Sequence, residues 1–499
     1  MQHLAARGHT VDVVFSAERD DCAQVFAGWR GAYDSIRHLK IPSRTGWWWT
    51  AADPLRALRD YFQYLRPEYQ DAHELFERVA RRIPRLMRRI FDKQRLRRTK
   101  LVDFIDRSLA AIERSLPVDA GIAKWLAVLQ PDAVLISPLI DLDYFQLDVL
   151  KAARSLEIPN GHLVASWDNL TTKGRIQLVA DIVVMWNETQ RREAIELHSV
   201  PPDRIVVTGA QLHDRWFELQ ASSHRSAFCA RVGGLDPTES IILYVCSSPF
   251  ICVDETEFVA QWVRAIRSDP ELSRFGILIR PHPLHYKQWR NIEISSMGRS
   301  VIWPSTGAMP IGNQDIQDYF DSLWYADAVV GINTSVFLEA GIIGRPTLTV
   351  RTPAFAGTQF GTQHFRYVVE GGLLKVANTF DEHMDQLKCA VKNDASTREQ
   401  IRSFVGSFLR PHGLDKPATP FVVEAVESLG RRGHTPAEAA PLLAPLIRAA
   451  LAPLAALYLR PRYRAVLGMR EQTIANLKPS GIWPSHGTKS VNLPRQRGS

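Results

Sequence analysis

The sequence predicts an α/β protein of two domains, each built on a parallel β-sheet with helices between its strands. Its 499 residues exceed the size of one ordinary domain. Short apolar runs of strand length alternate with helical stretches, which is the pattern of a parallel sheet. The alternation pauses over a connector near 210–225 and then restarts. Two such units imply facing Rossmann-like domains with a cleft between their strand ends.

Composition indicates a globular protein of a reducing compartment. Apolar residues make up 45% of the chain and charged residues 23%, which is normal for soluble proteins. The five cysteines form no CxxC pair, so neither a disulfide framework nor a zinc site is expected. The sequence shows no signal peptide and no apolar run of about 18 residues. We therefore predict a cytoplasmic protein.

The N-terminal domain, predicted over 1–218, begins unusually. Residues 1–9 read as the end of a helix with a glycine stop, and Val11–Phe15 reads as a buried strand. A Rossmann-type domain normally opens one strand earlier, with a glycine-containing turn before that helix. Either the true start lies upstream or the domain lacks a central strand, and we favour the first explanation.

Residues 54–116 predict a long, basic helical insertion in this domain. Apolar side chains recur at helical spacing between Val79 and Ile90, and arginine and lysine crowd the other faces. The net charge of +8 is concentrated between Arg78 and Lys100. Such a segment can lie on the anionic inner face of the plasma membrane. A solvated helix face packed on the domain explains the pattern equally well.

Two sets of strands define the domain organisation. The first set is Asp132–Ser137, His162–Ser166, Asp181–Trp186 and Arg204–Thr208. The second set, in a domain predicted over 219–429, is Ile241–Cys246, Ile277–Arg280, the apolar strand before Asn333, and Thr347–Val350. From 430 to 499 we expect a helical segment, too interrupted by proline to span a membrane, and then a disordered tail.

The segment Asp327–Pro346 has the pattern of an anion-binding turn. A strand-like run is followed by Asn333, Thr334 and Ser335, all good helix N-caps, and then by an apolar helix. That order presents free backbone N–H groups at the carboxyl edge of a parallel sheet. Ser335 and Glu339 share a helix face, so we expect the hydroxyl near a phosphate and the carboxylate near a ribose. An ordinary capped helix with a solvated Glu339 is the alternative.

The motif Arg280–Pro281–His282–Pro283 follows another strand of the same domain. Proline on both sides of His282 stiffens the backbone and removes N–H donors. A fixed imidazole beside Arg280 suits a diphosphate, with His282 donating to an oxygen that gains charge as the bond breaks. We therefore expect a cationic cradle of imidazole and backbone amides around a pyrophosphoryl leaving group. A turn with a histidine packed over it is the alternative.

A third set of polar residues follows the strand His162–Ser166. Trp167, Asp168, Asn169 and Lys173 stand at its end. A carboxylate near a lysine and an amide suits a general base, so we assign Asp168 this role toward an acceptor hydroxyl. The alternative is that Asp168 or Asn169 only caps a helix.

Three further residues are placed at the predicted cleft. Asp141 follows a strand and, with Asp143, has the spacing of an acidic metal-binding pair. Such pairs are common by chance, so we predict no metal. Gln359 and His364 lie in a Gly-rich loop, which we expect to form a flexible lip.

Together these motifs resemble the GT-B class of nucleotide-sugar transferases, over roughly 132–423. More narrowly, they resemble the CDP-glycerol glycerophosphotransferases and the capsule polysaccharide transferases. The 280–283 motif resembles the His-Pro motif that contacts the donor phosphate in those enzymes. The 327–346 segment resembles their Ser/Thr–helix–Glu element, which implies Thr334 and Ser335 as phosphate ligands and Glu339 as a ribose ligand. Phe408–Gly413 resembles the closing motif of the glycerophosphotransferases.

One motif departs from this pattern. Where the glycerophosphotransferases carry a histidine as the proposed base, this chain has Asp168, which leaves the reaction type open. The connector Gly209–Ala210–Gln211, with Asp214 after it, is similar to that of the non-hydrolysing UDP-N-acetylglucosamine 2-epimerases. Those enzymes share the GT-B fold and have a different chemistry.

The resemblance implies an inverting, metal-independent transferase that uses no cofactor. It would move a glycosyl or glycerophosphoryl group from a nucleotide-activated donor to a cell-envelope polysaccharide or lipid-linked acceptor. The C-terminal domain would hold the donor and the N-terminal domain the acceptor. A sugar epimerase and a non-catalytic, membrane-associated nucleotide-sugar binder are the alternatives. Nucleic acid is not an expected partner.

Overall fold

A computed structural model describes residues 1–15, 22–83, 85–91, 100–140, 144–292, 297–305, 312–433, 436 and 440–458. Asp141 lies outside the described residues, as do the most basic part of the insertion, 92–99, and the tail beyond 458. What the sequence predicts for those positions stays a prediction.

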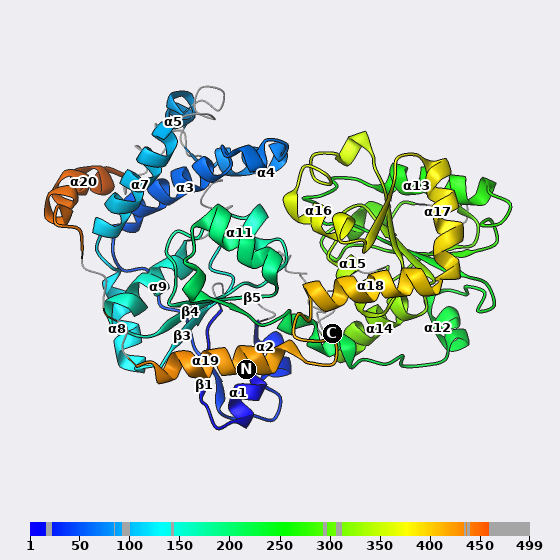
Figure 1. Ribbon diagram of the computed structural model, residues 1–499, viewed down its shortest axis with the longest axis horizontal. Helices are drawn as coiled ribbons and strands as arrows, with labels where there is room; N and C mark the ends of the chain where they lie inside the picture. The colour runs from blue at the N-terminus through cyan, green and yellow to red at the C-terminus, as the bar shows by residue number, and fades with distance from the viewer. Residues whose placement is uncertain are drawn as a thin grey trace, which may run out of the picture.

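The C-terminal domain is built on a six-stranded parallel sheet (Figure 1). The strand order is β12-β11-β10-β7-β8-β9. The strands are β7 (Ile241–Val245), β8 (Gly276–Arg280), β9 (Ser300–Ile302), β10 (Ala328–Gly331), β11 (Thr347–Val350) and β12 (Leu374–Ala377). Strands β7, β8, β10 and β11 are buried along their whole length, as expected for a parallel sheet between two helix layers.

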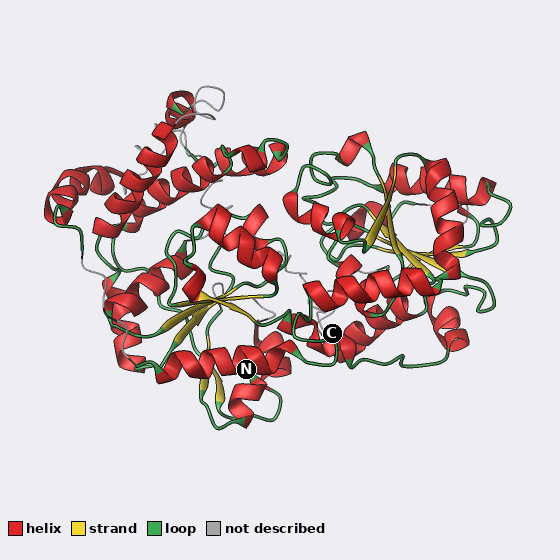
Figure 2. Cartoon of the chain, viewed as in Figure 1, coloured by secondary structure: helices red, strands yellow, loops and turns green. Residues whose placement is uncertain are grey.

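Helices cover both faces of this sheet, and Figure 2 shows them in red on either side of the yellow strands. Alternate residues of the strands face one helix layer or the other. The helices of the domain are α12 (Arg225–Val232), α13 (Thr256–Ser268), α14 (Asn313–Trp324), α15 (Val336–Ile342), α16 (Gln363–Glu370), α17 (Phe380–Lys392) and α18 (Ala395–Phe408). Ile242 and Tyr244 pack with α13 and α17. Ile241 and Leu243 pack with α12, α14 and α15. Successive side chains of a strand point to opposite faces, so one strand contributes to the apolar core on both sides of the sheet.

The N-terminal domain has a four-stranded parallel sheet and, apart from it, a pair of strands. The sheet has the order β3 (Val134–Ile136), β4 (Asn160–Leu163), β5 (Ile182–Met185) and β6 (Ile205–Val207). Strands β1 (Val11–Val13) and β2 (Ile36–His38) pair in parallel, and among the described strands they pair only with each other. The accompanying helices are α1 (Gln2–Ala6), α2 (Cys22–Arg30), α8 (Ala120–Leu129), α9 (Phe145–Ser155), α10 (Asn169–Thr172) and α11 (Glu188–His198).

A helical insertion stands beside this sheet, as predicted over 54–116. It comprises α3 (Trp49–Gln63), α4 (His73–Ala80), α5 (Arg85–Ile90) and α7 (Lys100–Ser115), coloured blue to cyan in Figure 1. Apolar side chains of these helices, among them Tyr61, Phe62 and Leu75, form one cluster. Helix α20 (Ala444–Tyr458) packs on α3 and α7, where the Thr50 hydroxyl donates to the Ala455 carbonyl at 3.1 Å. The helix predicted beyond residue 430 therefore joins the insertion.

The outer side of the insertion exposes large apolar side chains. Ile90 is 61% exposed, Leu101 53% and Phe104 64%. Val102 and Ile105 of the same helix pack inward on the apolar cluster, so α7 is apolar on both sides. Among the described helices, none combines the length and the apolar character needed to cross a membrane. The predicted contact with a membrane surface stays a prediction.

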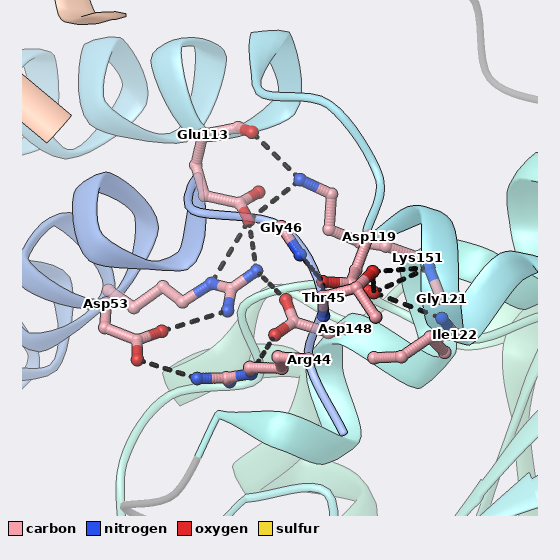
Figure 3. Close-up of polar contacts among 11 residues, drawn as sticks. Arg44, Thr45, Gly46, Asp53, Glu113, Asp119, Gly121, Ile122, Asp148 and Lys151 are labelled. Carbon is pink, nitrogen blue, oxygen red and sulfur yellow. Dashed lines mark hydrogen bonds and ion pairs between the residues drawn. The ribbon is translucent and has the colours of Figure 1, made fainter. Parts of the chain in front are cut away.

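A buried cluster of charges joins the insertion to the sheet domain (Figure 3). The Arg56 guanidinium of α3 lies 2.7 Å from Glu113 of α7 and 2.7 Å from Asp148 of α9. Lys151 lies 3.1 Å from Glu113, and Arg44 lies 2.7 Å from Asp148. Burial raises the pKa of Glu113, but Arg56 and Lys151 outweigh burial and lower it to about 2. Opposite charges thus pair at the joint between three helices.

Two connectors cross between the domains and are bonded to each other. The 3₁₀ helix η3 (Gln211–Phe217) leads out of the N-terminal domain, and residues 409–417 lead from α18 back to α19 (Ala418–Arg431). Asp214 accepts the backbone N–H of Ala418 at 2.9 Å and of Thr419 at 2.7 Å. Its carboxylate also lies 3.1 Å from Arg410. Helix α19 then packs on the N-terminal sheet.

The predicted fold class is confirmed. The chain forms two Rossmann-like α/β domains, with a helical insertion and a C-terminal helical segment. The strand Val11–Phe15 is present as the shorter β1. The exact domain boundaries at 218 and 429 stay predictions, and α19 lies against the first sheet although its sequence falls in the second predicted domain.

The charge cluster at the joint predicts a large loss of stability when one member is neutralised. Glu113→Gln leaves Arg56 and Lys151 without a full counter-charge in a buried position, so the free energy of unfolding should fall by about 3 kcal/mol. Urea denaturation measures it. Glu257→Gln is the matched control, because Glu257 pairs with Arg264 on the open surface and should change stability by less than about 0.5 kcal/mol. Equal, small effects in both variants would contradict a stabilising joint.

Candidate functional site

The carboxyl ends of three adjacent strands are aligned in the C-terminal sheet. Gly331 of β10 is in register with Val245 of β7, and Val245 is in register with Arg280 of β8. Neighbouring strands lie about 4.8 Å apart. The turns after these strands therefore begin side by side, and they carry the residues that the sequence predicts for donor binding.

Arg280 and Glu339 lie together at this edge, joined through Tyr319. Arg280 is buried, its guanidinium donates to the Ser322 hydroxyl at 3.1 Å, and its Cζ lies 4.8 Å from the centre of the Tyr319 ring. The Tyr319 hydroxyl donates to the Glu339 carboxylate. Burial raises the pKa of Glu339 to about 7, against the opposing effects of Tyr319 and Arg280. Burial lowers the pKa of Arg280 to about 10, so it stays charged at neutral pH.

His282 faces a different neighbour, the loop after β7. Its backbone N–H is directed at the Cys246 sulfur, and its Nδ1 accepts the backbone N–H of Leu284 at 3.1 Å. Burial, with a smaller effect of His285, lowers the pKa of His282 to about 4. The ring is therefore neutral at pH 7 with its proton on Nε2. The expectation of a cationic imidazole is therefore wrong. The positive charge at this edge of the sheet belongs to Arg280.

The turn after β10 keeps the features of an anion site in part. Ser335 is exposed, and the Thr334 hydroxyl accepts the backbone N–H of Val336 at 3.3 Å. Within the described part of the chain, the N–H groups of Thr334 and Ser335 have no acceptor. Asn333 differs, because its buried side chain donates to the Thr358 carbonyl at 2.8 Å. Asn333 thus ties this turn to the 353–362 loop.

Gln359 requires a correction. We expected it on a flexible lip of the cleft, but its side chain is fully buried. Its Nε2 donates to the Ile332 carbonyl at 3.1 Å and to the Thr349 hydroxyl at 2.9 Å. It therefore joins the ends of β10 and β11 to the loop that contains it. The glycine-rich sequence of this loop predicts a mobile segment, but three buried hydrogen bonds of the Gln359 side chain hold it in place.

Asp168 and His364 meet where the two domains join. His364, at the start of α16, packs edge-on against Trp167, with ring centres 4.7 Å apart. Asp168 accepts the Ser166 hydroxyl at 2.5 Å and the Thr172 hydroxyl at 2.9 Å. Burial raises the pKa of Asp168, but His364, Lys173 and the two hydroxyls outweigh burial and lower it. Burial lowers the pKa of His364 to about 4.

The neighbours of Asp168 have mainly structural contacts. Trp167 is buried in an apolar cluster that spans both domains and includes Phe337 and Phe365. The Asn169 side chain accepts the backbone N–H of Ala165 at 3.1 Å and of Ser166 at 2.9 Å, so it closes the turn after β4. Asn169 therefore fits the alternative of a local cap better than a contact with acceptor.

Two buried carboxyl groups near the site had no assigned role in the sequence. Glu255, at the start of α13, accepts the Tyr244 hydroxyl at 3.0 Å and the Ser247 N–H at 3.0 Å. Burial raises its pKa to about 7. Burial also raises the pKa of Glu193 of α11 to about 8, against an opposing bond from Tyr367. Acidic residues at helix starts are common, and nothing in the local sequence marks these two as buried.

The comparisons with known proteins give similarity of structure only. No family model matches the chain, and no curated protein matches it. A UDP-GlcNAc 2-epimerase of Methanocaldococcus jannaschii, in complex with UDP-GlcNAc and UDP, is 15% identical over 65% of this chain and 81% of its own, with a TM-score of 0.41. A further UDP-N-acetylglucosamine 2-epimerase is 14% identical over 86% of this chain and 98% of its own, with a TM-score of 0.45.

The wall teichoic acid polymerase TagF is also similar. It is 14% identical over 51% of this chain and 59% of its own, with a TM-score of 0.34. The fold and the site rest on this chain's own strand order and contacts.

Because the pKa of Glu255 is raised, the difference in stability between the parent protein and Glu255→Gln should depend on pH. Between pH 4.5, the ordinary pKa of a glutamate, and about 7, the folded state keeps a proton that the unfolded state has lost. Stability contributed by this group is therefore lost as pH rises. Glu255→Gln should gain stability relative to the parent across this interval, by up to about 3 kcal/mol. Urea denaturation at several pH values measures the difference, and a pH-independent difference would contradict the assignment.

Proposed function

We propose that the protein is a GT-B-type transferase that moves a glycosyl or glycerophosphoryl group from a nucleotide-activated donor to a cell-envelope polysaccharide or lipid-linked acceptor. The observation that carries the proposal is the alignment of the ends of β7, β8 and β10. It gathers Arg280, His282, Thr334 and Ser335 at one edge of the donor-side sheet, while Asp168 lies at the junction with the other domain.

On the donor side, positive charge and hydrogen-bond donors suit a diphosphate. Arg280 keeps its charge in a buried position, which strengthens its attraction for an anion. His282, neutral and protonated on Nε2, donates to a phosphate oxygen that gains charge as the bond breaks. The free N–H groups of Thr334 and Ser335 are further donors. The Glu339 carboxyl accepts from a ribose hydroxyl.

On the acceptor side, Asp168 takes the proton of the attacking hydroxyl. The acceptor oxygen forms a bond to the anomeric carbon, or to phosphorus for a glycerophosphoryl donor. The bond from that atom to the nucleotide phosphate breaks, and the phosphate oxygen takes the electron pair. Because the pKa of Asp168 is low, we expect proton transfer late, when bond formation has made the hydroxyl acidic. The hydroxyls of Ser166 and Thr172 orient the carboxylate, and His364 lies beside it.

This proposal predicts both nucleotide binding and loss of turnover in two variants. One of UDP, CDP, GDP or CMP should raise the melting temperature, because a ligand that binds only the folded state stabilises it. With the matching activated donor, Asp168→Asn and His282→Ala should each reduce turnover about 100-fold. His224→Ala, an exposed histidine before α12 in the same domain, is the control and should be neutral.

The outcomes separate the proposal from its alternatives. Near wild-type turnover in both variants would refute the mechanism. Conversion of UDP-N-acetylglucosamine without any acceptor would instead assign an epimerase. Binding of a nucleotide sugar with no turnover, even with a lipid-linked acceptor, would assign a binding protein.

A further inference from the structure

Helix α4 of the insertion reaches across to the C-terminal domain. Just before it, the Glu68 carbonyl accepts the Gln363 side-chain amide at 2.9 Å, and Asp71 lies 3.3 Å from Arg366. The approach is close, because a Cβ at Gly361 would stand 2.6 Å from the Asp71 carbonyl oxygen. Figure 1 shows α4 beside α16 at this junction. The insertion therefore contributes residues to the region between the domains.

Arg78, in the last turn of α4, lies between the two sets of strand-end residues. Its Cζ stands 4.6 Å from the centre of the Phe250 ring, in the loop after β7. Its Nη2 donates to the Thr172 carbonyl, and the Thr172 hydroxyl donates to Asp168 at 2.9 Å. One guanidinium thus contacts the acceptor-side turn and the donor-side loop at once.

The guanidinium of Arg78 lies apart from the carboxylates of the described residues. Within the described part of the chain no carboxylate lies within ion-pair distance of it. Its Nε is buried and makes no hydrogen bond there. The residue as a whole is half-buried, and a partly buried cation without a carboxylate is suited to an anionic ligand, because charges taken out of water are usually paired. Its neighbours Arg66 and Arg88 differ, since each lies within 3.5 Å of a glutamate.

We propose that Arg78 binds the phosphate groups of the ligand where the two domains join, and this inference rests on the proposed function. Phe250 belongs to the loop after β7, whose end is in register with the ends of β8 and β10. An anion held by His282 and the turn at Thr334 is therefore next to this loop. The planar guanidinium fork suits phosphate oxygens.

The proposal gives the insertion a role in ligand binding. Arg280 approaches the anion from the donor-side sheet, and Arg78 approaches it from the other domain. A diphosphate between them bridges α4 and the C-terminal domain. Nucleoside diphosphates and inorganic pyrophosphate should share this contact, and a nucleoside without phosphate should not.

Calorimetric titration of the full chain with UDP, CDP, GDP, inorganic pyrophosphate and uridine tests this role. Arg78→Ala should weaken pyrophosphate and the preferred nucleoside diphosphate at least 10-fold, because charge-assisted bonds are lost. Arg78→Met keeps an apolar stem against Phe250 without the charge, and should weaken them equally. Arg66→Ala is the matched control, since Arg66 of the same insertion donates to the backbone carbonyls of Leu197 and Glu196 at 2.9 Å. Its affinities should stay within about twofold.

Each outcome is decisive. Unchanged affinities in folded Arg78→Met overturn the inference and leave the proposed function standing. Loss of pyrophosphate binding in Arg78→Met, in a protein that binds no nucleotide, supports the anion site and refutes the proposed function. If the parent binds neither pyrophosphate nor any nucleotide, both are overturned.

Discussion

The carboxylate of Asp214 is the interaction on which the arrangement of the two domains depends. It lies on the connector that leaves the first domain and binds the start of α19, on the connector that returns from the second. Gly209, with φ of +96°, permits the crossing, because a Cβ there would stand 2.8 Å from the Ala418 side chain. Two crossings tied at one point limit rotation between the domains. The strand ends of both sheets are thereby held toward one region.

Burial controls the charges in that region. It raises the pKa of Glu339 and of Glu255 to about 7, so neither carries a full negative charge at neutral pH. It lowers the pKa of His282 to about 4, so the imidazole adds no positive charge. What remains at the donor side is the positive charge of Arg280, with that of Arg78 nearby. With its carboxyl groups largely neutral and its arginines charged, this region favours an anion such as a nucleotide phosphate.

The sequence predicted the fold well because apolar runs of strand length report burial on both faces of a parallel sheet. It also placed the 280–283 motif and the turn at Asn333 at strand ends of one domain, and the ends of β8 and β10 share an edge of the sheet. It misjudged Gln359 and left Asn169 open between two roles, because whether a polar side chain faces a cleft or closes its own loop depends on contacts set by the whole fold. Arg78 was indistinguishable from the arginines around it. Only the packing of α4 against Phe250 and Thr172 marks it, and those partners lie far away in sequence.

The central claim is that a phosphate-bearing ligand binds where the two domains join. Hydrogen–deuterium exchange with and without the preferred nucleoside diphosphate tests it most directly. The account predicts slower exchange at 246–252, 280–285 and 333–338, together with 166–173 in the other domain. Slower exchange confined to the small cavity beside Trp48 and Trp49, with those four segments unchanged, would contradict it.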